Sequence, residues 1–539
     1  MTEETGYSLV EFFDAVVRAH PERTAVLFGE EALHFTALAE LSWKAAAALH
    51  HRGVRKGQTV GLHLYNRPEY IAAFYGACRL GAIPFNVNYR YGRQELAYLY
   101  ADAQAAAVFC EADLRSLAEQ SMESAGVGAT LLELADIHSA DGSAFAAAAS
   151  GLGLHPSGHD LSLLYTGGTT GMPKGVMWRH IDLYHGALGS GALFLRCDPI
   201  LSPQALEARV THMPELRYLA IAPLMHGAAF WSSLITLHSG LGLVLLPDRQ
   251  FNAEQVLDTI EIHSVNILAV VGDAMAVPLL DAIERSPGRW NLTKLVHFGN
   301  GGAVLSASTK ARIRARLPNV QIGDGMGSSE SGILGSGDMP ADASGLLRLP
   351  ARPDVKVIVD RERLARPGEQ GMLARTGPIP LGYWRDEKKT LENFLLIDGT
   401  RYVLTGDAAI QSADGSVVLL GRDSQCVNTG GEKVFVEEVE TQIKTHPRVL
   451  DCNAVGVPDP KWGQKLVALV SVRTSDASAG LSPDPLESEL IQLCRQNLAA
   501  YKAPKRIWVV PEIPRGANGK ADYRWAKETA VSLDSAEPQ

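Results

Sequence analysis

A segment rich in glycine and hydroxyl groups, residues 163–178, has the side chains needed to hold a polyphosphate; its sequence is LLYTGGTTGMPKGVMW. Glycines let successive backbone N–H groups approach an anion without a Cβ in the way, hydroxyls add donors, and a lysine supplies a mobile positive charge. An apolar run precedes these residues. The candidate phosphate-binding residues are Thr166, Gly167, Gly168, Thr169, Thr170, Gly171 and Lys174.

Two common phosphate-binding patterns do not fit this segment. The Walker pattern needs a lysine directly after its last glycine and a hydroxyl residue after the lysine, whereas Met172 follows Gly171 and Gly175 follows Lys174. The dinucleotide-binding pattern G-x-G-x-x-G is also absent. A flexible linker is the remaining alternative, and the strand-like run before the segment and the lysine after it disfavour a linker.

Two further glycine-rich segments, residues 299–302 (GNGG) and 323–332 (GDGMGSSESG), are predicted to be loops that follow strands. In open α/β sheets, ligands bind beyond the carboxyl ends of the strands. The three glycine-rich segments are therefore predicted to converge on one site.

The elements that would position these segments alternate between helical and strand-like patterns. Alternation of this kind predicts parallel strands covered by helices. Helices are predicted over residues 10–20, 36–51, 253–263 and 306–317, and strands over 59–64, 106–111, 241–247, 265–271 and 295–298. Residues 136–160 are interpreted as a connection to the phosphate-binding segment, and residues 190–217, with three prolines, as an irregular excursion.

The pattern changes in the last third of the chain. Short strands and turns over residues 355–420 predict a mostly antiparallel part. A compact βαβ-like piece is predicted beyond Gly421, with helices over 437–446 and around Leu490 and strands over 449–457, 466–472 and 507–510. A domain boundary is placed at residues 422–424.

Size and composition limit the class of protein. A chain of 539 residues is too long for one core of usual size, so two or more domains are expected. A net charge of -10 argues against a general nucleic-acid binder. Six scattered cysteines without a C-x-x-C pair indicate reduced, buried thiols. No signal peptide and no run of about 20 apolar residues is found, so a cytoplasmic protein without an integral membrane segment is expected.

Four more motifs follow the first in chain order. They are GSSE (327–330), YVLTGD (402–407), GRDSQCVNTGGEKVFVEEVE (421–440) and PRGANGK (514–520). Together the five motifs strongly resemble the adenylate-forming superfamily, which contains acyl-CoA synthetases, peptide-synthetase adenylation domains and luciferases. The similarity spans residues 8–527. Within the superfamily, the sequences of the motifs are most similar to those of CoA ligases of the fatty-acid and sterol-side-chain type.

The resemblance implies a fold and a reaction. The expected fold is α/β: a large N-terminal AMP-binding domain (1–421) of stacked α/β subdomains plus a small β-subdomain, a hinge (422–424), and a smaller mobile α+β C-terminal domain (425–539). The expected enzyme is an AMP-forming ligase, which joins a hydrophobic carboxylic acid to the α-phosphate of ATP with release of pyrophosphate. The thiol of CoA then displaces AMP from the acyl-adenylate. Neither step needs a protein nucleophile, so catalysis is mostly positioning and charge stabilisation.

The resemblance also assigns residues. Thr166 to Lys174 would cover the β- and γ-phosphates, and Thr170 and Glu330 would hold Mg²⁺. Asp407, assisted by Arg422, would accept the ribose hydroxyls, and Lys520 would bridge the substrate carboxylate and the α-phosphate. The remaining implied positions are Gly301, Gly302, Asp324, Gly325, Met326 and Ser329 around the nucleotide and acyl group, His226 in the acyl pocket, Gly430 and Gly431 facing CoA, and Ser424 at the hinge.

Some positions depart from the family pattern, and alternatives stay open. Met326 stands where most relatives have an aromatic residue, Ser424 where the hinge residue is commonly charged, and Val436 in place of a usual proline. His226 is alternatively a packed histidine after a strand. An adenylating enzyme with an aryl or amino acid, a carrier-protein thiol, or an oxyanion such as nitrite with an amine acceptor is the main functional alternative. A non-catalytic nucleotide-binding protein and an ADP-forming kinase are two others. The acid and the oligomeric state, including a homo-oligomer, are left open by the sequence.

Overall fold

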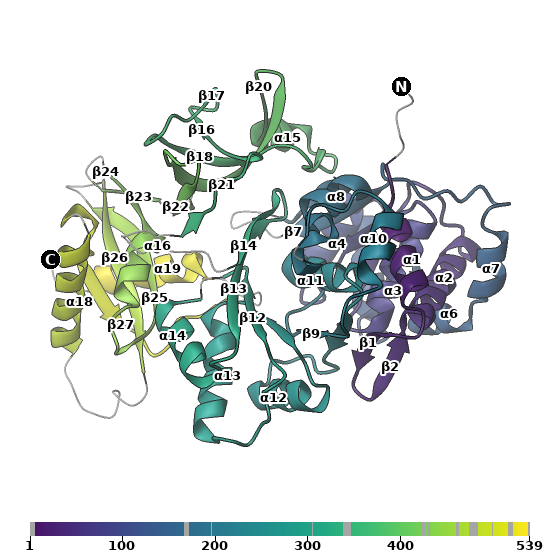
Figure 1. Cartoon of the computed structure of the whole chain (residues 1–539). Helices are drawn as coiled ribbons and strands as arrows, with labels where there is room; N and C mark the ends of the chain where they lie inside the picture. The colour runs from purple at the N-terminus through teal and green to yellow at the C-terminus, as the bar shows by residue number, and fades with distance from the viewer. Residues whose placement is uncertain are drawn as a thin grey trace.

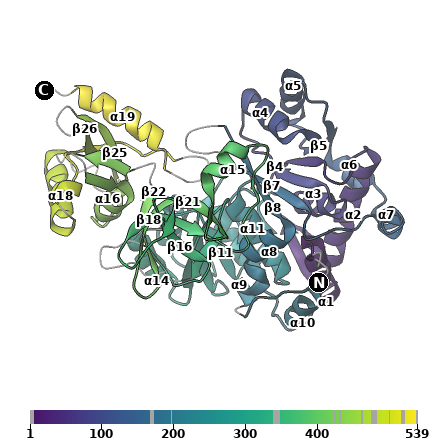
Figure 2. The ribbon, with the colours of Figure 1, turned by 90° about the horizontal axis from the view of Figure 1, so that it is seen from above.

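The computed structural model describes residues 6–166, 172–195, 197–303, 305–337, 347–422, 426–429, 432–459, 463–473, 483–498, 500–515 and 521–536. Within these residues the strands form four sheets. The C-terminal piece lies at one end of the molecule in both views, and the first helices of the chain lie toward the other end (Figures 1 and 2). The predicted α/β fold with a smaller C-terminal part is confirmed.

The first sheet is mainly parallel and has the strand order β14-β13-β12-β11-β9-β10-β1-β2 in the described residues. Only its edge strands β2 and β14 pair antiparallel. Its strands are β1 (Thr24–Phe28), β2 (Glu31–His34), β9 (Arg217–Ala220), β10 (Gly242–Leu245), β11 (Ile267–Val270), β12 (His297–Gly301), β13 (Gln321–Ser328) and β14 (Gly332–Gly337).

The second sheet has the order β19-β8-β7-β4-β3-β5-β6 and is parallel from β7 to β6. Its strands are β3 (Thr59–His63), β4 (Ile83–Asn86), β5 (Ala105–Cys110), β6 (Thr130–Leu132), β7 (Leu161–Thr166), β8 (Lys174–Arg179) and β19 (Gly382–Tyr383). From β3 the chain crosses to β4 on one side, and from β5 it crosses to β6 on the other. The chain connections therefore run in opposite directions from the neighbouring strands β3 and β5.

Helices fill the space between these sheets and cover their outer faces. One continuous core joins both sheets and includes Phe13, Val26 and Leu62. The helices of this layer are α1 (Leu9–Ala19), α2 (Phe35–His51), α3 (Pro68–Arg79), α8 (His180–Gly186), α9 (Ala192–Leu195), α10 (Pro203–Val210) and α11 (Gly227–His238), with the 3-10 turn η1 (Gly189–Gly191). The outer cover of the first sheet is α12 (Ala253–Ile262), α13 (Asp273–Arg285) and α14 (Ala307–Arg316), and that of the second is α4 (Arg93–Ala103) and α5 (Arg115–Ala125).

The third sheet is antiparallel, as predicted for residues 355–420. Its strands are β15 (Arg348–Leu349), β16 (Val355–Val359), β17 (Arg363–Leu364), β18 (Gln370–Arg375), β20 (Phe394–Ile397), β21 (Thr400–Gln411) and β22 (Val417–Arg422), and α15 (Glu387–Asn393) lies between β19 and β20 in the chain.

The C-terminal piece is built on a sheet of order β24-β23-β26-β25, with β27 added parallel to β26. α16 and α18 pack on one face and α19 on the other. Its elements are β23 (Cys426–Thr429), β24 (Glu432–Phe435), α16 (Val436–Ile443), β25 (Val449–Asp459), β26 (Gly463–Val472), α18 (Pro483–Asn497), η3 (Ala500–Lys502), β27 (Arg506–Val509) and α19 (Tyr523–Ala536). Phe435 contacts Leu420 and Ala408 of the third sheet.

The predicted connection (136–160) and the predicted irregular excursion (190–217) both contain helices. Residues 136–160 hold α7 (Gly142–Ala148) and the end of α6 (Leu134–Ser139), and residues 190–217 hold α9 and α10. Pro203 is compatible with α10 because it stands in the first turn, where its missing N–H is not needed, and the Ser202 side chain accepts from the backbone N–H of Ala205.

The two predicted glycine loops are mostly strands, which corrects the sequence interpretation. Residues 299–301 end β12, and residues 323–332 form most of β13 and the turn into β14. The glycines allow close pairing of the strands: a Cβ on Gly327 would lie 2.2 Å from the carbonyl oxygen of Gly332. A glycine-rich composition is compatible with both a close-packed hairpin and a ligand-binding loop, so composition alone could not distinguish them.

Candidate functional site

The candidate phosphate-binding segment joins two antiparallel strands. Thr166 ends β7 and pairs directly with Lys174, which begins β8. Gly167, Gly168, Thr169, Thr170 and Gly171 lie outside the described residues. The structure therefore fixes both ends of this segment at the same edge of the second sheet.

Lys174 forms an ion pair with Asp386, which caps the first turn of α15. This hydrogen bond raises the pKa of the Lys174 ammonium and lowers the pKa of the Asp386 carboxyl. The lysine side chain is 39% exposed, so it faces solvent as well as its partner. A phosphate ligand would have to share Lys174 with Asp386 or displace it.

Asn86, at the end of β4, holds β7 in place. Its Nδ2 donates to the carbonyl oxygens of Tyr165 (2.8 Å) and Met225 (2.7 Å), and its Oδ1 accepts from the backbone N–H of Tyr165 (2.7 Å). These bonds link the residue before Thr166 to the residue before His226. Sequence reasoning gave Asn86 no role, because its partners are 79 and 139 positions away.

The turn between β13 and β14 carries Ser329 and Glu330 to the strand that begins with Lys174. The indole Nε1 of Trp178, in β8, donates to the carbonyl oxygen of Ser329 at 2.9 Å. The hydroxyl of Tyr383, in β19, donates to Oε1 of Glu330 at 3.2 Å, and β19 pairs with β8. The structure thus brings Ser329 and Glu330 to the same strands as Lys174, as predicted for two of the three glycine-rich segments.

A buried arginine supports this turn. Arg375, in β18, donates from Nη1 to the carbonyl oxygens of Gly186 (2.6 Å) and Ser331, and its Nε donates to Asp354 at 3.2 Å. Burial lowers the pKa of this guanidinium to about 10, against the effect of Asp354. Arg375 is a supporting residue that the sequence did not reveal, because a lone arginine is usually a surface residue.

The ends of β12 and β13 lie side by side. Gly301 pairs with Gly325, and Asn300 with Asp324. The Asp324 carboxylate accepts from Nδ2 of Asn300 (3.1 Å) and from Nζ of Lys310 (2.5 Å), so this side chain already has two partners. The predicted neighbours Gly301, Asp324 and Gly325 are therefore together, and Gly302 follows with a φ of +83°.

Met326 is half-buried, and it packs against the core of the third sheet. The sequence interpretation gave its thioether a contact with the adenine in place of an aromatic ring. In the structure, part of this side chain is used to join the first and third sheets.

His226 precedes α11, and its carbonyl oxygen accepts from the backbone N–H of Phe230 at 3.0 Å. The carbonyl oxygen of Met225 accepts a hydrogen bond from Asn86, and the carbonyl oxygen of Ala222 accepts one from Nδ2 of Asn66 at 3.0 Å. The segment before α11 is therefore fixed from the second sheet on both sides of Leu224. Behind it, a cavity of about 20 Å³ is lined mainly by apolar and aromatic side chains, among them Phe74, Trp178, Phe230 and Trp231.

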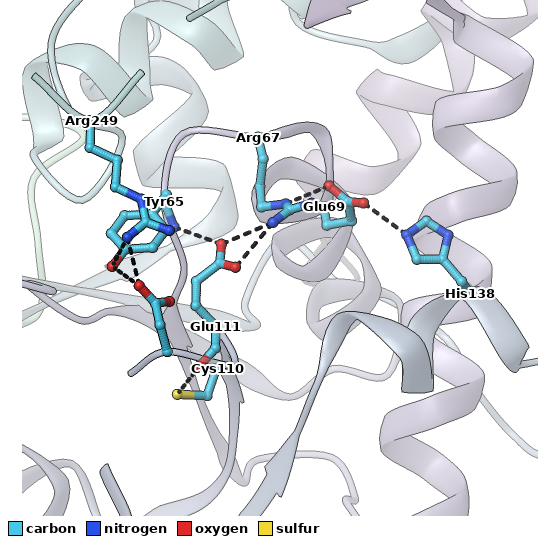
Figure 3. Close-up of polar contacts among 8 residues, drawn as sticks. Tyr65, Arg67, Glu69, Cys110, Glu111, His138 and Arg249 are labelled. Carbon is cyan, nitrogen blue, oxygen red and sulfur yellow. Dashed lines mark hydrogen bonds and ion pairs between the residues drawn. The ribbon is translucent and has the colours of Figure 1, made fainter. Parts of the chain in front are cut away.

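The two chain neighbours of Asn66, Tyr65 and Arg67, belong to a polar network at the carboxyl ends of β3 and β5 (Figure 3). Arg67 donates to Glu69 (2.9 Å) and Glu111 (3.0 Å), and Glu111 accepts from the backbone N–H of Tyr65 (3.2 Å). Arg249 stacks on the Tyr65 ring at 3.8 Å. Because the crossovers divide between β3 and β5, this network occupies the edge where open α/β sheets bind ligands.

Asp407 and Arg422 are direct partners in the register of β21 and β22. The backbone N–H of Asp407 donates to the Thr405 hydroxyl at 3.1 Å. The structure thus brings together the two residues expected to hold the ribose, on a different sheet from Lys174 and Glu330.

The predicted residues of the C-terminal piece lie mostly outside the described residues: Ser424, Gly430, Gly431 and Lys520 are among those not described. The ends of the segment that carries Lys520 are described, because Arg515 and Ala521 form an isolated antiparallel bridge. Among the described helices, none is long and apolar enough to cross a bilayer. The described residues also hold no cluster of three or more His, Cys, Asp or Glu side chains suited to a metal ion.

Two family models match the chain: AMP-binding enzyme over residues 13–384, and AMP-binding enzyme C-terminal domain over residues 438–520. The chain is 38% identical to a medium-chain acyl-CoA ligase, Mig, of Mycobacterium avium, over 98% of this chain and 99% of that protein. It is 37% identical to a medium/long-chain-fatty-acid–CoA/3-oxocholest-4-en-26-oate–CoA ligase of Mycobacterium marinum, over 97% of this chain and 96% of that protein. Among solved structures, ATP-bound MatB from Rhodopseudomonas palustris matches with a TM-score of 0.79 at 23% identity, over 98% and 100% of the two chains.

Proposed function

The chain belongs to the AMP-binding enzyme family, and on that premise we propose that it is an AMP-forming ligase that makes a CoA thioester from a hydrophobic carboxylic acid. ATP activates the acid as an acyl-adenylate, and CoA displaces AMP from it. One observation carries the proposal: the similarity to acyl-CoA ligases runs over nearly the whole chain and includes the C-terminal module.

The apolar surroundings of α11 support a hydrophobic acid. Phe230 packs edge-to-face on Phe74 with ring centroids 4.8 Å apart, and Trp231 packs on Trp178 at 5.8 Å. The cavity that these rings line, about 20 Å³, holds roughly one water molecule. An acyl chain placed there would have to move an aromatic side chain, and His226, directly before α11, is proposed to line the acyl pocket. Medium- or long-chain fatty acids and sterol-side-chain acids are the proposed substrate class.

The segment 166–174 is proposed to bind the phosphates that leave as pyrophosphate. Thr166 and Lys174 lie at one sheet edge with the Glu330 turn beside them, as such a role requires. Because Asp386 already neutralises part of the Lys174 charge, phosphate binding would exchange one anionic partner for another. The hydroxyl and backbone donors between the two residues are proposed to complete the site.

Magnesium is proposed to be held by Glu330 and Thr170. Mg²⁺ usually keeps several waters and binds through one or two carboxylates together with the substrate phosphates. Glu330 suits this role, because it is a half-exposed carboxylate oriented by Tyr383. When bound, the ion would neutralise charge on the phosphate oxygens.

The nucleoside is proposed to lie between the first and third sheets. Asp407 would accept both ribose hydroxyls, a bidentate role suited to a carboxylate, with Arg422 beside it. The backbones of Gly301, Gly302 and residues 324–326 would frame the adenine and the acyl group. Ser329 would border the phosphates.

Lys520 is proposed to bridge the acid carboxylate and the α-phosphate during adenylation. We propose a division of the chain into an AMP-binding domain (1–421), a hinge at 422–424 that includes Ser424, and a C-terminal domain (425–539). Gly430 and Gly431 are proposed to meet CoA after the C-terminal domain rotates.

Mass spectrometry of reaction mixtures tests the proposed function. The protein is incubated with ATP, Mg²⁺ and CoA together with medium- and long-chain fatty acids, a sterol-side-chain acid and an aromatic acid. We expect the CoA thioester of at least one hydrophobic acid, with AMP in equal amount. Absence of any CoA thioester across the panel would contradict the proposal, and accumulation of an adenylate without a thioester would favour another acceptor.

A further inference from the structure

The segment that contains Lys520 is held at both ends by acidic side chains of the C-terminal piece. Arg515, before the segment, and Ala521, after it, form an antiparallel bridge, and Tyr523 begins α19 two residues later. The residues described on the two sides of the segment are therefore held by the groups that bind Arg515 and Tyr523.

Asp451 binds the first end. In β25, it accepts from Nε of Arg515 at 2.8 Å and from Nη2 at 2.7 Å, a two-bond geometry that fixes the direction of the guanidinium. Nζ of Lys444, directly after α16, lies 2.9 Å from the same carboxylate. The Asp451 side chain is only 18% exposed, so water screens these contacts little.

Glu440 binds the second end. Its Oε2 accepts from the Tyr523 hydroxyl at 3.0 Å, and its Oε1 accepts from the backbone N–H of Ala454, in β25, at 2.8 Å. Glu440 is 6% exposed, and burial raises the pKa of its carboxyl to about 8. The hydroxyl of Tyr523 is thereby fixed to α16 and, through Ala454, to β25.

Both contacts are made to one rigid support. Glu440 stands on α16 one turn before Lys444, which contacts Asp451, and α16 packs against β25 in the core of the C-terminal piece. Figures 1 and 2 show α16, β25 and α19 beside one another. A change at either acid would therefore release Arg515 or Tyr523 from this support while α16 and β25 stay packed together.

We propose that Glu440 and Asp451 are positioning residues, which fix the two ends of the segment 516–520 so that Lys520 reaches the acid and the α-phosphate in the adenylation step. The inference rests on the proposed role of Lys520. It assigns the acids no contact with substrate; they act through Arg515 and Tyr523.

The test measures the two half-reactions separately in Glu440→Gln and Asp451→Asn. Acid-dependent exchange of pyrophosphate into ATP reports adenylation, and acyl-CoA formation from supplied acyl-adenylate reports the thioester step. We expect exchange to fall by about tenfold or more, because small displacements of an aligned group cost that much, while the thioester step stays within about twofold. Equal losses in both half-reactions would contradict the inference.

A matched control lies on the same helix. Glu438 is also buried on α16 and accepts two bonds from Nζ of Lys502, at 2.7 and 2.8 Å, but it contacts neither Arg515 nor Tyr523. Glu438→Gln should lower the melting temperature of the protein without changing the ratio of the two half-reactions. A selective loss of adenylation in this control would show that any damage to α16 has that effect, and would overturn the inference.

The Lys520→Ala background separates failure of this inference from failure of the proposed function. Lys520→Ala should lose exchange selectively, and Glu440→Gln added to it should cause no further loss. If Lys520→Ala has no selective effect, the role proposed for Lys520 is wrong. If it has that effect but Glu440→Gln reduces exchange equally in both backgrounds, only the inference is wrong. Should Glu440→Gln fail to fold, Tyr523→Phe removes the same hydrogen bond and carries the same expectations.

Discussion

At the scale of single residues, Asp407 gives a direct prediction. Asp407→Asn keeps the shape of the side chain but removes the charge that would accept two ribose hydroxyls. Hydrogen bonds to charged groups contribute about 1.5–3 kcal/mol, so KM for ATP should rise roughly ten- to hundredfold. Steady-state kinetics at varied ATP concentration measure this KM. Asp414→Asn is the control, because Asp414 lies in the turn between β21 and β22, is 62% exposed and pairs with Arg348. Equal KM values in the two variants would disprove the role of Asp407.

The ion pair between Lys174 and Asp386 gives a second residue-scale prediction. Asp386→Asn keeps an oxygen that can cap α15 but no longer holds the lysine by charge. Exposed ion pairs contribute about 0.2–1 kcal/mol, so freeing Lys174 should lower KM for ATP by roughly one and a half- to fivefold. Lys174→Ala combined with Asp386→Asn should abolish this gain. A higher KM in Asp386→Asn would mean that the pair positions Lys174 for phosphate.

At the scale of elements, Asn86 is expected to hold β4, β7 and the segment before α11 together. Asn86→Ala leaves the Tyr165 N–H and the Tyr165 and Met225 carbonyls without their buried partner. Unsatisfied buried groups cost about 1–3 kcal/mol each, so the free energy of unfolding in urea should fall by at least that amount. Since Thr166 and His226 are the next residues, kcat/KM should fall for both ATP and the acid.

Asn453 supplies the matched control for Asn86. It is fully buried in β25, and its side-chain amide has no hydrogen-bond partner among the described residues. Asn453→Ala therefore leaves no group newly unsatisfied, and its effect on stability should be smaller than that of Asn86→Ala. The opposite order would show that the Asn86 bonds are not what joins these elements.

The sequence predicted the elements whose patterns are local. Alternating helical and strand-like segments indicated the parallel sheets, and short turn-rich strands indicated the antiparallel one. The glycine segments at 299–302 and 323–332 were misread as loops because strand pairing at Gly327 depends on Gly332 and on neighbouring strands. Asn86 and Arg375 were not recognised because their partners are distant in the chain, and no local pattern encodes such contacts.

At the scale of the whole molecule, three fully buried histidines should make the protein sensitive to acid. Burial lowers the pKa of His63, His180 and His238 to about 4. Because an unfolded histidine titrates near about 6.5, the unfolded chain binds more protons as pH falls from about 6.5 to 4, and the folded state loses stability there. For each additional proton that the unfolded chain binds, the free energy of unfolding falls by about 1.4 kcal/mol per pH unit. Glu440 acts in the opposite direction, since its raised pKa lets the folded state bind a proton below about 8.

Urea unfolding at about pH 7 and about pH 5 measures this acid sensitivity. We expect a lower free energy of unfolding at the acidic pH, and a smaller drop in His63→Gln, which removes one buried titrating group. His34→Gln is the control, because the His34 side chain is 47% exposed. A drop of the same size in all three proteins would show that the buried histidines are not its cause.

The molecule as a whole brings one edge of its second sheet, the turn after β13 and the β21–β22 pair into one structure with the C-terminal piece. These parts are proposed to act on a single ATP, whose α-phosphorus is attacked by the carboxylate of the acid. Transfer of an oxygen isotope from the acid to AMP tests this attack most directly. The acid is supplied with ¹⁸O in its carboxylate, together with ATP and CoA, and the AMP is examined by mass spectrometry. If the carboxylate attacks the α-phosphorus, its oxygen bridges acid and phosphate, and cleavage of the acyl C–O bond by CoA leaves one ¹⁸O in AMP. Unlabelled AMP, or ADP with label in inorganic phosphate, would contradict the proposed reaction.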